Sequence, residues 1–89
     1  MDVRIRVEGR VQGVGFRAFV RDVALELGLT GEVWNVLDGA VELVASGDSS
    51  QIALLPERLR LGPGRVDRLV SEPCSASATD EFRIGPTRP

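Results

Sequence analysis

Three residue types are missing from the sequence, which contains no histidine, lysine or tyrosine and carries only arginine as its eleven basic residues. The chain therefore cannot use a histidine general base, a Ser-His triad, a Schiff-base lysine or the lysine of a P-loop. Its carboxylates are scattered along the chain, so a site for a hard metal is possible but not indicated. Any catalysis must depend on arginine, amides, hydroxyls and backbone groups.

Cysteine and long apolar runs are also scarce. Cys74 is the only cysteine, which excludes an internal disulfide and makes the reducing cytoplasm the expected compartment. No apolar stretch approaches the ~20 residues of a membrane span, and Met1 leads directly into a strand pattern, so we expect neither a membrane partner nor a signal peptide. A net charge of −2 does not suit a nucleic-acid partner. The 89 residues predict one domain, 1–89, and we expect a monomer.

Hydrophobic periodicity predicts the elements of the first half of the chain. Apolar and charged residues alternate over 3–8, which is typical of a strand with one buried face. Apolar residues at helical spacing follow from Phe16 to Leu27 and predict a one-sided helix. Two more strands, over about 32–37 and 40–45, are joined by the turn dipeptide Asp38-Gly39.

The second half contains a helical stripe that is interrupted by Pro56, so we expect a kink or two short helices with this proline in the first turn of the second. The remaining segments are predicted as a strand over 66–70, a loop over 71–79, a short strand over 81–84 and a frayed tail over 85–89. The order βαββαβ, with a possible short fifth strand, predicts an α+β fold: a two-layer sandwich of the ferredoxin-like, split βαβ kind with an antiparallel sheet.

Residues 9–17, GRVQGVGFR, form the most informative segment, because they connect the first strand to the first helix through a glycine-rich loop. Such a loop leaves backbone N–H groups unpaired at the positive end of a helix, and Arg17 lies on the first turn of that helix. These features are typical of a site for a phosphate-sized anion. The alternative from the residues alone is a tight connection in which Gly13 and Gly15 only relieve backbone strain.

The segment 9–17 resembles the signature of the acylphosphatase family. The resemblance continues through 28–31, Val33, Asn35 and Asp38-Gly39 to Arg65-Val66-Asp67, and so covers about residues 3–84. It implies the hydrolysis of a small-molecule acyl phosphate to a carboxylate and inorganic phosphate, without metal or cofactor.

The same resemblance implies a role for individual residues. It places a catalytic arginine at Arg17 and a water-positioning asparagine at Asn35. It places the phosphate-binding loop at Arg10, Val11, Gln12, Gly13, Val14, Gly15 and Phe16. The side chain of Arg17 can take two phosphoryl oxygens in a planar fork, and the amide of Asn35 can orient a water molecule without acting as a strong base.

Three positions depart from the family pattern. Glu32 and Trp34 stand where relatives commonly have a tryptophan and an arginine, and both are expected to point away from the face of Asn35. Pro56 interrupts a helix that is usually continuous. Two alternative functions remain open at this point: a phosphate- or carbamoyl-phosphate-binding module of a larger carbamoyltransferase, and a ferredoxin-like RNA-binding or ligand-sensing module. The acidic balance and the few aromatic residues disfavour RNA binding.

Overall fold

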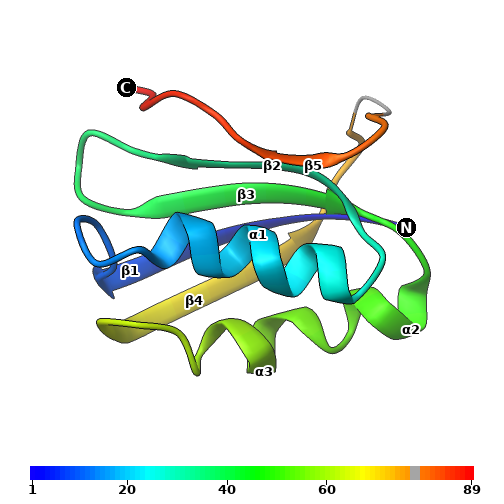
Figure 1. The fold of residues 1–89 in the computed structure, drawn as a ribbon, viewed down its shortest axis with the longest axis horizontal. Coiled ribbons are helices and arrows are strands. Elements are labelled where there is room, and N and C mark those ends of the chain that lie inside the picture. The colour runs from blue at the N-terminus through cyan, green and yellow to red at the C-terminus, as the bar shows by residue number, and fades with distance from the viewer. Residues whose placement is uncertain (77–78) are drawn as a thin grey trace.

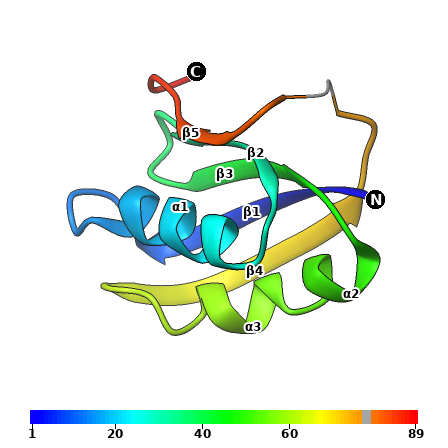
Figure 2. The ribbon, with the colours of Figure 1, turned by 45° about the vertical axis from the view of Figure 1, so that its right-hand side comes forward.

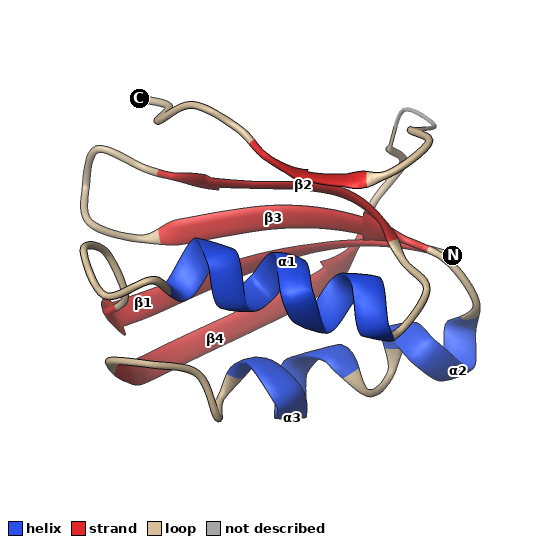
Figure 3. Ribbon diagram, viewed as in Figure 1, coloured by secondary structure: helices blue, strands red, loops and turns tan. Residues whose placement is uncertain are grey.

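The computed structural model describes residues 1–76 and 79–89, which form one five-stranded sheet and three helices (Figures 1 and 3). The strands are β1 (Asp2–Arg10), β2 (Thr30–Asn35), β3 (Val41–Ser46), β4 (Arg65–Pro73) and β5 (Phe82–Ile84), in the spatial order β4-β1-β3-β2-β5. The helices are α1 (Phe16–Glu26), α2 (Ser49–Ile52) and α3 (Leu55–Leu59). None of the helices in the described residues has the length and hydropathy that a membrane span needs.

The helices cover one face of the sheet, so the molecule has two layers around one main core (Figure 2). The alternation predicted for the first strand places its apolar side chains in that core and its charged side chains on the other face. The core is formed mainly by Val3, Ile5, Val7, Phe16, Val20, Val23, Val33, Leu43, Leu55 and Leu59. The predicted α+β, ferredoxin-like sandwich is confirmed, whereas the predicted purely antiparallel sheet is wrong.

The sheet is mixed because β5 pairs with β2 in parallel, while the pairs β1–β3, β1–β4 and β2–β3 are antiparallel. The reason lies in the path of the chain. β4 ends beside Val3, at the end of the sheet where β5 begins beside Gly31. The last strand must therefore run opposite to β4, and this direction is the direction of β2.

Pro56 divides the second helical segment as predicted. It occupies the first turn of α3, where its missing N–H would have no partner within the helix, and α2 ends before it at Ile52. Ile52, Leu55 and Leu59 are buried on the sheet-facing side. The interruption therefore keeps the apolar stripe intact and changes only its backbone.

β4 is longer than the predicted strand and contains an irregularity in its pairing. The loop predicted over 71–79 is wrong for residues 71–73, which continue β4 beside β1, while residues 77–78 lie outside the described residues. A register shift between Glu8 and Gly9 also inserts a bulge, so that Val66 and Leu69 both contact the core although they are three residues apart. A bulge adds one residue to one strand and reverses the alternation beyond it.

The end of the chain also differs from the frayed tail expected over 85–89. The N–H of Gly85 donates to the carbonyl of Val33 at 2.8 Å, and the N–H of Arg88 donates to the carbonyl of Asn35 at 2.8 Å. Arg88 forms a parallel bridge with Val36. Figure 1 shows this segment continuing beside β2 after β5. It is ordered because the outer edge of β2 offers free backbone groups beyond the last residue of β5.

Candidate active site

The loop between β1 and α1 is shaped by two glycines with left-handed backbone angles. Gly13 has φ 74° and Gly15 has φ 82°, and Gly15 is the N-cap of α1 without a side-chain hydrogen bond. Side chains would be strained at both positions. Within the described residues, the N–H groups of residues 13–18 have no protein acceptor. The loop therefore presents free donors at the positive end of an 11-residue helix, which is a favourable place for an anion.

A cavity of about 190 Å³ opens beside this loop and brings together distant parts of the chain. Both predicted key residues, Arg17 from α1 and Asn35 from the end of β2, line it. The other lining residues are Val11, Gly13, Gly15, Phe16, Ala18 and Ile84. Four of the seven predicted loop residues therefore line this cavity, while Arg10, Gln12 and Val14 do not.

The side chain of Asn35 lies on the helix-facing side of β2. Its neighbour across the ladder is Val41, and Val33, two residues earlier, is fully buried. The Oδ1 atom of Asn35 is buried and has no hydrogen-bond partner among the described residues. A buried polar atom without a partner costs about 1–3 kcal/mol and needs an explanation in a native fold. Binding of a ligand in this cavity would provide one.

The guanidinium of Arg17 is partly buried and is oriented by the last strand. Its Nη1 donates to the carbonyl oxygen of Gly85 at 3.3 Å. This contact occupies only one of the five N–H donors of an arginine, so the others remain available to an anion in the cavity. The sequence analysis missed Gly85, Ile84 and Ala18 as parts of the site. A backbone carbonyl leaves no signal in a sequence. Ile84 at the end of β5 and Gly85 directly after it lie there because β5 runs parallel to β2.

The side chain of Gln12 does not line the cavity and contacts the next turn of the chain instead. Its side-chain Nε2 donates to the carbonyl oxygens of Val36 at 2.6 Å and Ala40 at 2.8 Å. The amide therefore points into the turn between β2 and β3 and joins that turn to the glycine-rich loop. On the same turn, the N–H of Ala40 and the guanidinium of Arg6 lower the pKa of Asp38 by hydrogen bonding to its carboxylate.

Arg10 and Val14 are directed elsewhere. Arg10 ends β1 opposite Arg65 and is exposed. Val14 is partly buried against the core. Neither side chain lines the cavity. Glu32 and Trp34 lie on the opposite face of β2 from Asn35, as expected, and Trp34 packs with Val36, Ala40 and Val44 in a small second cluster.

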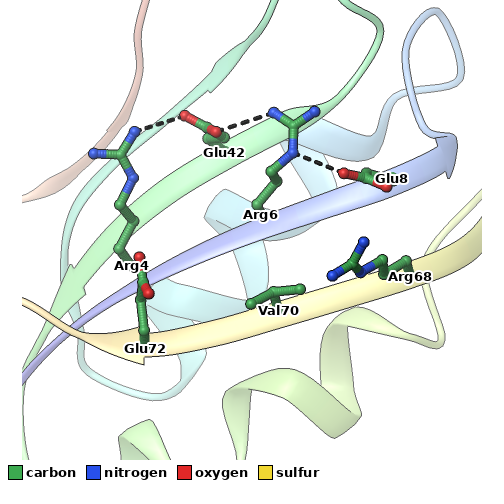
Figure 4. Close-up of a pocket in the computed structure, with 7 residues that line it drawn as sticks. All are labelled: Arg4, Arg6, Glu8, Glu42, Arg68, Val70 and Glu72. Atoms are coloured by element: carbon green, nitrogen blue, oxygen red, sulfur yellow. Dashed lines mark hydrogen bonds and ion pairs between the residues drawn. The ribbon is translucent and has the colours of Figure 1, made fainter.

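A larger hollow of about 310 Å³ lies on the outer face of the sheet, away from the loop (Figure 4). Two of its three arginines, Arg4 and Arg6, already have carboxylate partners. Arg4 pairs with Glu42 at 2.8 Å, and Arg6 pairs with Glu8 at 2.8 Å and Glu42 at 3.1 Å. The hydrogen bonds that Arg6 donates to the carboxylates of Glu8, Asp38 and Glu42 raise its pKa above the usual range. This face is balanced in charge and carries no free helix end, so the smaller cavity is the better candidate for the active site.

The donor set of the smaller cavity fits an anion and not a metal ion. It consists of a guanidinium, a carboxamide and backbone N–H groups, none of which is an anionic ligand. In the described part of the chain, no group of three or more His, Cys, Asp or Glu residues is arranged to hold a metal.

Comparison with known proteins agrees with this geometry. The profile of the acylphosphatase family matches residues 3–84. The chain belongs to the acylphosphatase family. An acylphosphatase from Rhizobium etli is 56% identical over 61 residues, which span 68% of this chain and 65% of that protein. The crystal structure of acylphosphatase from Bacillus subtilis has a TM-score of 0.90 at 36% identity, covering 94% of this chain and 97% of that one.

The predicted resemblance is thereby confirmed, and the family supports an enzyme that hydrolyses acyl phosphates. Larger proteins are also similar in part. The structure of HypF from T. kodakarensis matches with a TM-score of 0.81 and 35% identity over 97% of this chain but only 12% of its own. A module of a larger protein is less well supported than an acylphosphatase, because the relatives of comparable length are acylphosphatases.

Proposed function

We propose that Arg17 and the amides of the glycine-rich loop hold the phosphoryl group of an acyl phosphate while Asn35 orients the attacking water, without a metal or cofactor. One observation supports this assignment above all. The carboxamide of Asn35 has a buried oxygen without a partner among the described residues, and it lines the same cavity as Arg17 and the free N–H groups. Both reacting groups of a hydrolysis, the phosphate and the water, thus have a place.

The chemistry demands little proton transfer from the enzyme. An acyl phosphate is a mixed anhydride with a good leaving group. The water oxygen forms a bond to phosphorus, the bond from phosphorus to the acyl oxygen breaks, and the carboxylate leaves with the electron pair. One proton of the water stays on its oxygen, which becomes part of the phosphate, and the other passes to a phosphoryl oxygen of the released phosphate. Because phosphoryl transfer depends on positioning and charge stabilisation, an arginine and aligned amides suffice.

Each residue acts on a different part of the reaction. The planar fork of Arg17 can contact two phosphoryl oxygens from the ground state onward, which lysine could not reproduce. The helix end adds roughly 0.3–1 kcal/mol for a negative group. The side chain of Asn35 can accept a hydrogen bond from a water through its oxygen and donate one through its NH₂ group. Rotation about χ2, which exchanges the positions of the oxygen and the NH₂ group, has a low barrier. Arg17 thus contributes to binding and rate, and Asn35 mainly to rate.

The test is hydrolysis of benzoyl phosphate in excess chelator by the wild type, Arg17→Ala and Arg21→Ala. Arg21 lies one helical turn after Arg17 and outside the cavity, so it is the matched control. We expect Arg17→Ala to raise KM and to lower kcat, with a loss of about 2.7–4 kcal/mol of transition-state stabilisation. Arg21→Ala should keep the activity. Turnover that stops in chelator, or an Arg17→Ala variant as active as the wild type, would contradict the mechanism.

We also propose that the enzyme acts as a cytoplasmic monomer in which residues 1–89 fold as one domain. The single cysteine favours a reducing compartment. Arg4 and Arg6 of the outer sheet face already pair with carboxylates of the same chain, which favours a monomer. Light scattering at enzyme concentrations near 0.1 mM would test the oligomeric state, and a dimer mass would contradict it.

A further inference from the structure

The segment Gly85–Arg88, which we call the C-terminal clamp, runs beside β2 and touches both proposed site residues. On the side of α1, the carbonyl of Gly85 accepts a hydrogen bond from Nη1 of Arg17 at 3.3 Å. Further along, the N–H of Arg88 donates to the carbonyl of Asn35 at 2.8 Å. Figure 1 shows this segment returning toward the end of the sheet at which the glycine-rich loop lies. One short segment is therefore linked to the phosphate-binding arginine and to the backbone of the asparagine.

The clamp is anchored on the other face of β2 by the side chain of Arg88. Its guanidinium carbon lies 3.7 Å from the centroid of the Trp34 ring, and its Nη2 donates to Oε1 of Glu32 at 3.2 Å. Trp34 is 2% exposed and the side chain of Glu32 is 15% exposed, so both partners are fixed by their surroundings. A guanidinium stacked on an indole ring and paired with a carboxylate has little freedom to move.

Gly85 lies directly against the carboxylate of Glu32. A Cβ atom at this position would overlap the Oε2 atom of Glu32. The carboxylate of Glu32 can therefore occupy its position beneath the clamp only because residue 85 has no side chain. The anchor of Arg88 and the carbonyl that Arg17 contacts are thus coupled through three residues, Glu32, Gly85 and Arg88.

We propose that Arg88 is a positioning residue for the proposed reaction: by stacking on Trp34 and pairing with Glu32, it holds the C-terminal clamp against β2 and so orients Arg17 and Asn35. This inference rests on the proposed function and deepens it. Without the anchor, the carbonyl of Gly85 is no longer fixed and the guanidinium of Arg17 samples other rotamers. An enzyme group that must first be ordered binds its ligand more weakly.

The test compares Arg88→Ala, Arg88→Lys and Arg83→Ala. Arg83 is the matched control, because it also pairs with Oε1 of Glu32, at 3.6 Å. Its side chain is more exposed than that of Arg88, and it belongs to β5 and not to the clamp. Binding of inorganic phosphate is measured by calorimetry, and kcat and KM are measured with benzoyl phosphate, all at a temperature where thermal melts show each variant folded.

For Arg88→Ala we expect the phosphate Kd and KM to rise by about 3- to 30-fold, and kcat to change less. A rise of this size lies within the roughly 100-fold loss of rate that a 1 Å misplacement can cause. Arg88→Lys keeps the charge but loses the planar stack, so it should restore part of the affinity. Arg83→Ala should match the wild type. If Arg88 only stabilised the fold, Arg88→Ala would lower the melting temperature but would not raise KM more than it changes kcat.

If Arg88→Ala does not fold, Glu32→Gln takes its place, since it removes the ion pair and leaves the stack; the phosphate Kd should then rise by a smaller factor. Phosphate affinity and KM equal to those of the wild type in a folded Arg88→Ala or Glu32→Gln variant would overturn the inference. So would an equal loss in Arg83→Ala. Absence of turnover by the wild type would instead overturn the proposed function. The two failures can be distinguished, because the phosphate Kd of each variant can be measured without turnover.

Discussion

At the scale of single residues, the site contains a group that the fold alone does not explain. Most buried polar atoms have partners, and an acceptor without one lowers stability by about 1–3 kcal/mol. Oδ1 of Asn35 is such an atom in the described part of the chain. An apolar residue at the end of β2 would fit beside Val33 and Val41 without that cost. The presence of asparagine there is consistent with a trade of stability for activity.

The substitution Asn35→Ala should therefore separate activity from stability. We expect kcat for benzoyl phosphate to fall by about 10²–10³, as for the loss of one oriented donor in other enzymes. The free energy of unfolding should stay unchanged or rise by up to about 1 kcal/mol, since the variant removes an unpaired acceptor. Urea unfolding and steady-state kinetics measure the two effects. A variant with lower stability and full activity would show that Asn35 serves the fold and not the reaction.

At the scale of elements, the site depends on contacts that join the two loops at one end of the sheet. Gln12 belongs to the glycine-rich loop, yet its amide donates to two carbonyls of the turn after Asn35. Those carbonyls, of Val36 and Ala40, also accept backbone hydrogen bonds within the turn. The glutamine is thus an added connection between the anion loop and the strand that carries Asn35.

Replacing Gln12 with alanine should loosen that connection. The loss of two hydrogen bonds predicts a decrease in the free energy of unfolding of about 1–3 kcal/mol, together with a higher KM because the loop amides are less well ordered. Gln12→Glu should have a larger effect, since a carboxylate cannot donate to two carbonyls. Gln51→Ala, in α2, is the control with no comparable contact among the described residues. Equal melting temperatures for Gln12→Ala and Gln51→Ala would refute this role.

Some helices and strands could be predicted from the sequence and others could not. α1 begins at Phe16 as expected, and the interruption at Pro56 follows from local chemistry, because periodicity and proline act within a few residues. The bulge opposite Gly9 could not be predicted, since alternation was counted as if β4 were regular. The order of residues 85–88 depends on pairing with β2, about 50 residues earlier in the sequence.

The candidate site also contains residues that could be predicted from the sequence and contacts that could not. Arg17 and Asn35 were predicted from a motif, and the structure brings both to one cavity, although their catalytic roles stay predictions. The place of Gln12 in the phosphate-binding loop also stays a prediction, and its side chain joins two loops. Its direction depends on where the β2–β3 turn lies, which only the folded chain determines. The contact of Arg17 with Gly85 uses a backbone carbonyl, and every residue has one.

At the scale of the whole molecule, the loop, the end of β2 and the C-terminal clamp meet at one end of a small two-layer domain (Figure 1). The cavity at this end is lined by residues of the loop after β1, of α1 and of the strands β2 and β5. Unfolding separates all of these segments and destroys the site. A ligand that binds only the folded state therefore stabilises the whole chain by mass action.

Inorganic phosphate, the proposed product, should raise the melting temperature of the wild type. At a concentration 100 times its Kd the stabilisation is about 2.7 kcal/mol, and in a domain of this size each kcal/mol corresponds to about 4–8 °C, so the shift should reach roughly 10–20 °C. Arg17→Ala should lose most of this shift, because its remaining donors are backbone amides. Sodium chloride at the same ionic strength is the control for general salt effects. If phosphate raised the melting temperatures of the wild type and Arg17→Ala equally, its action would be a solvent effect of the salt, and the cavity beside the glycine-rich loop would not be the phosphate site.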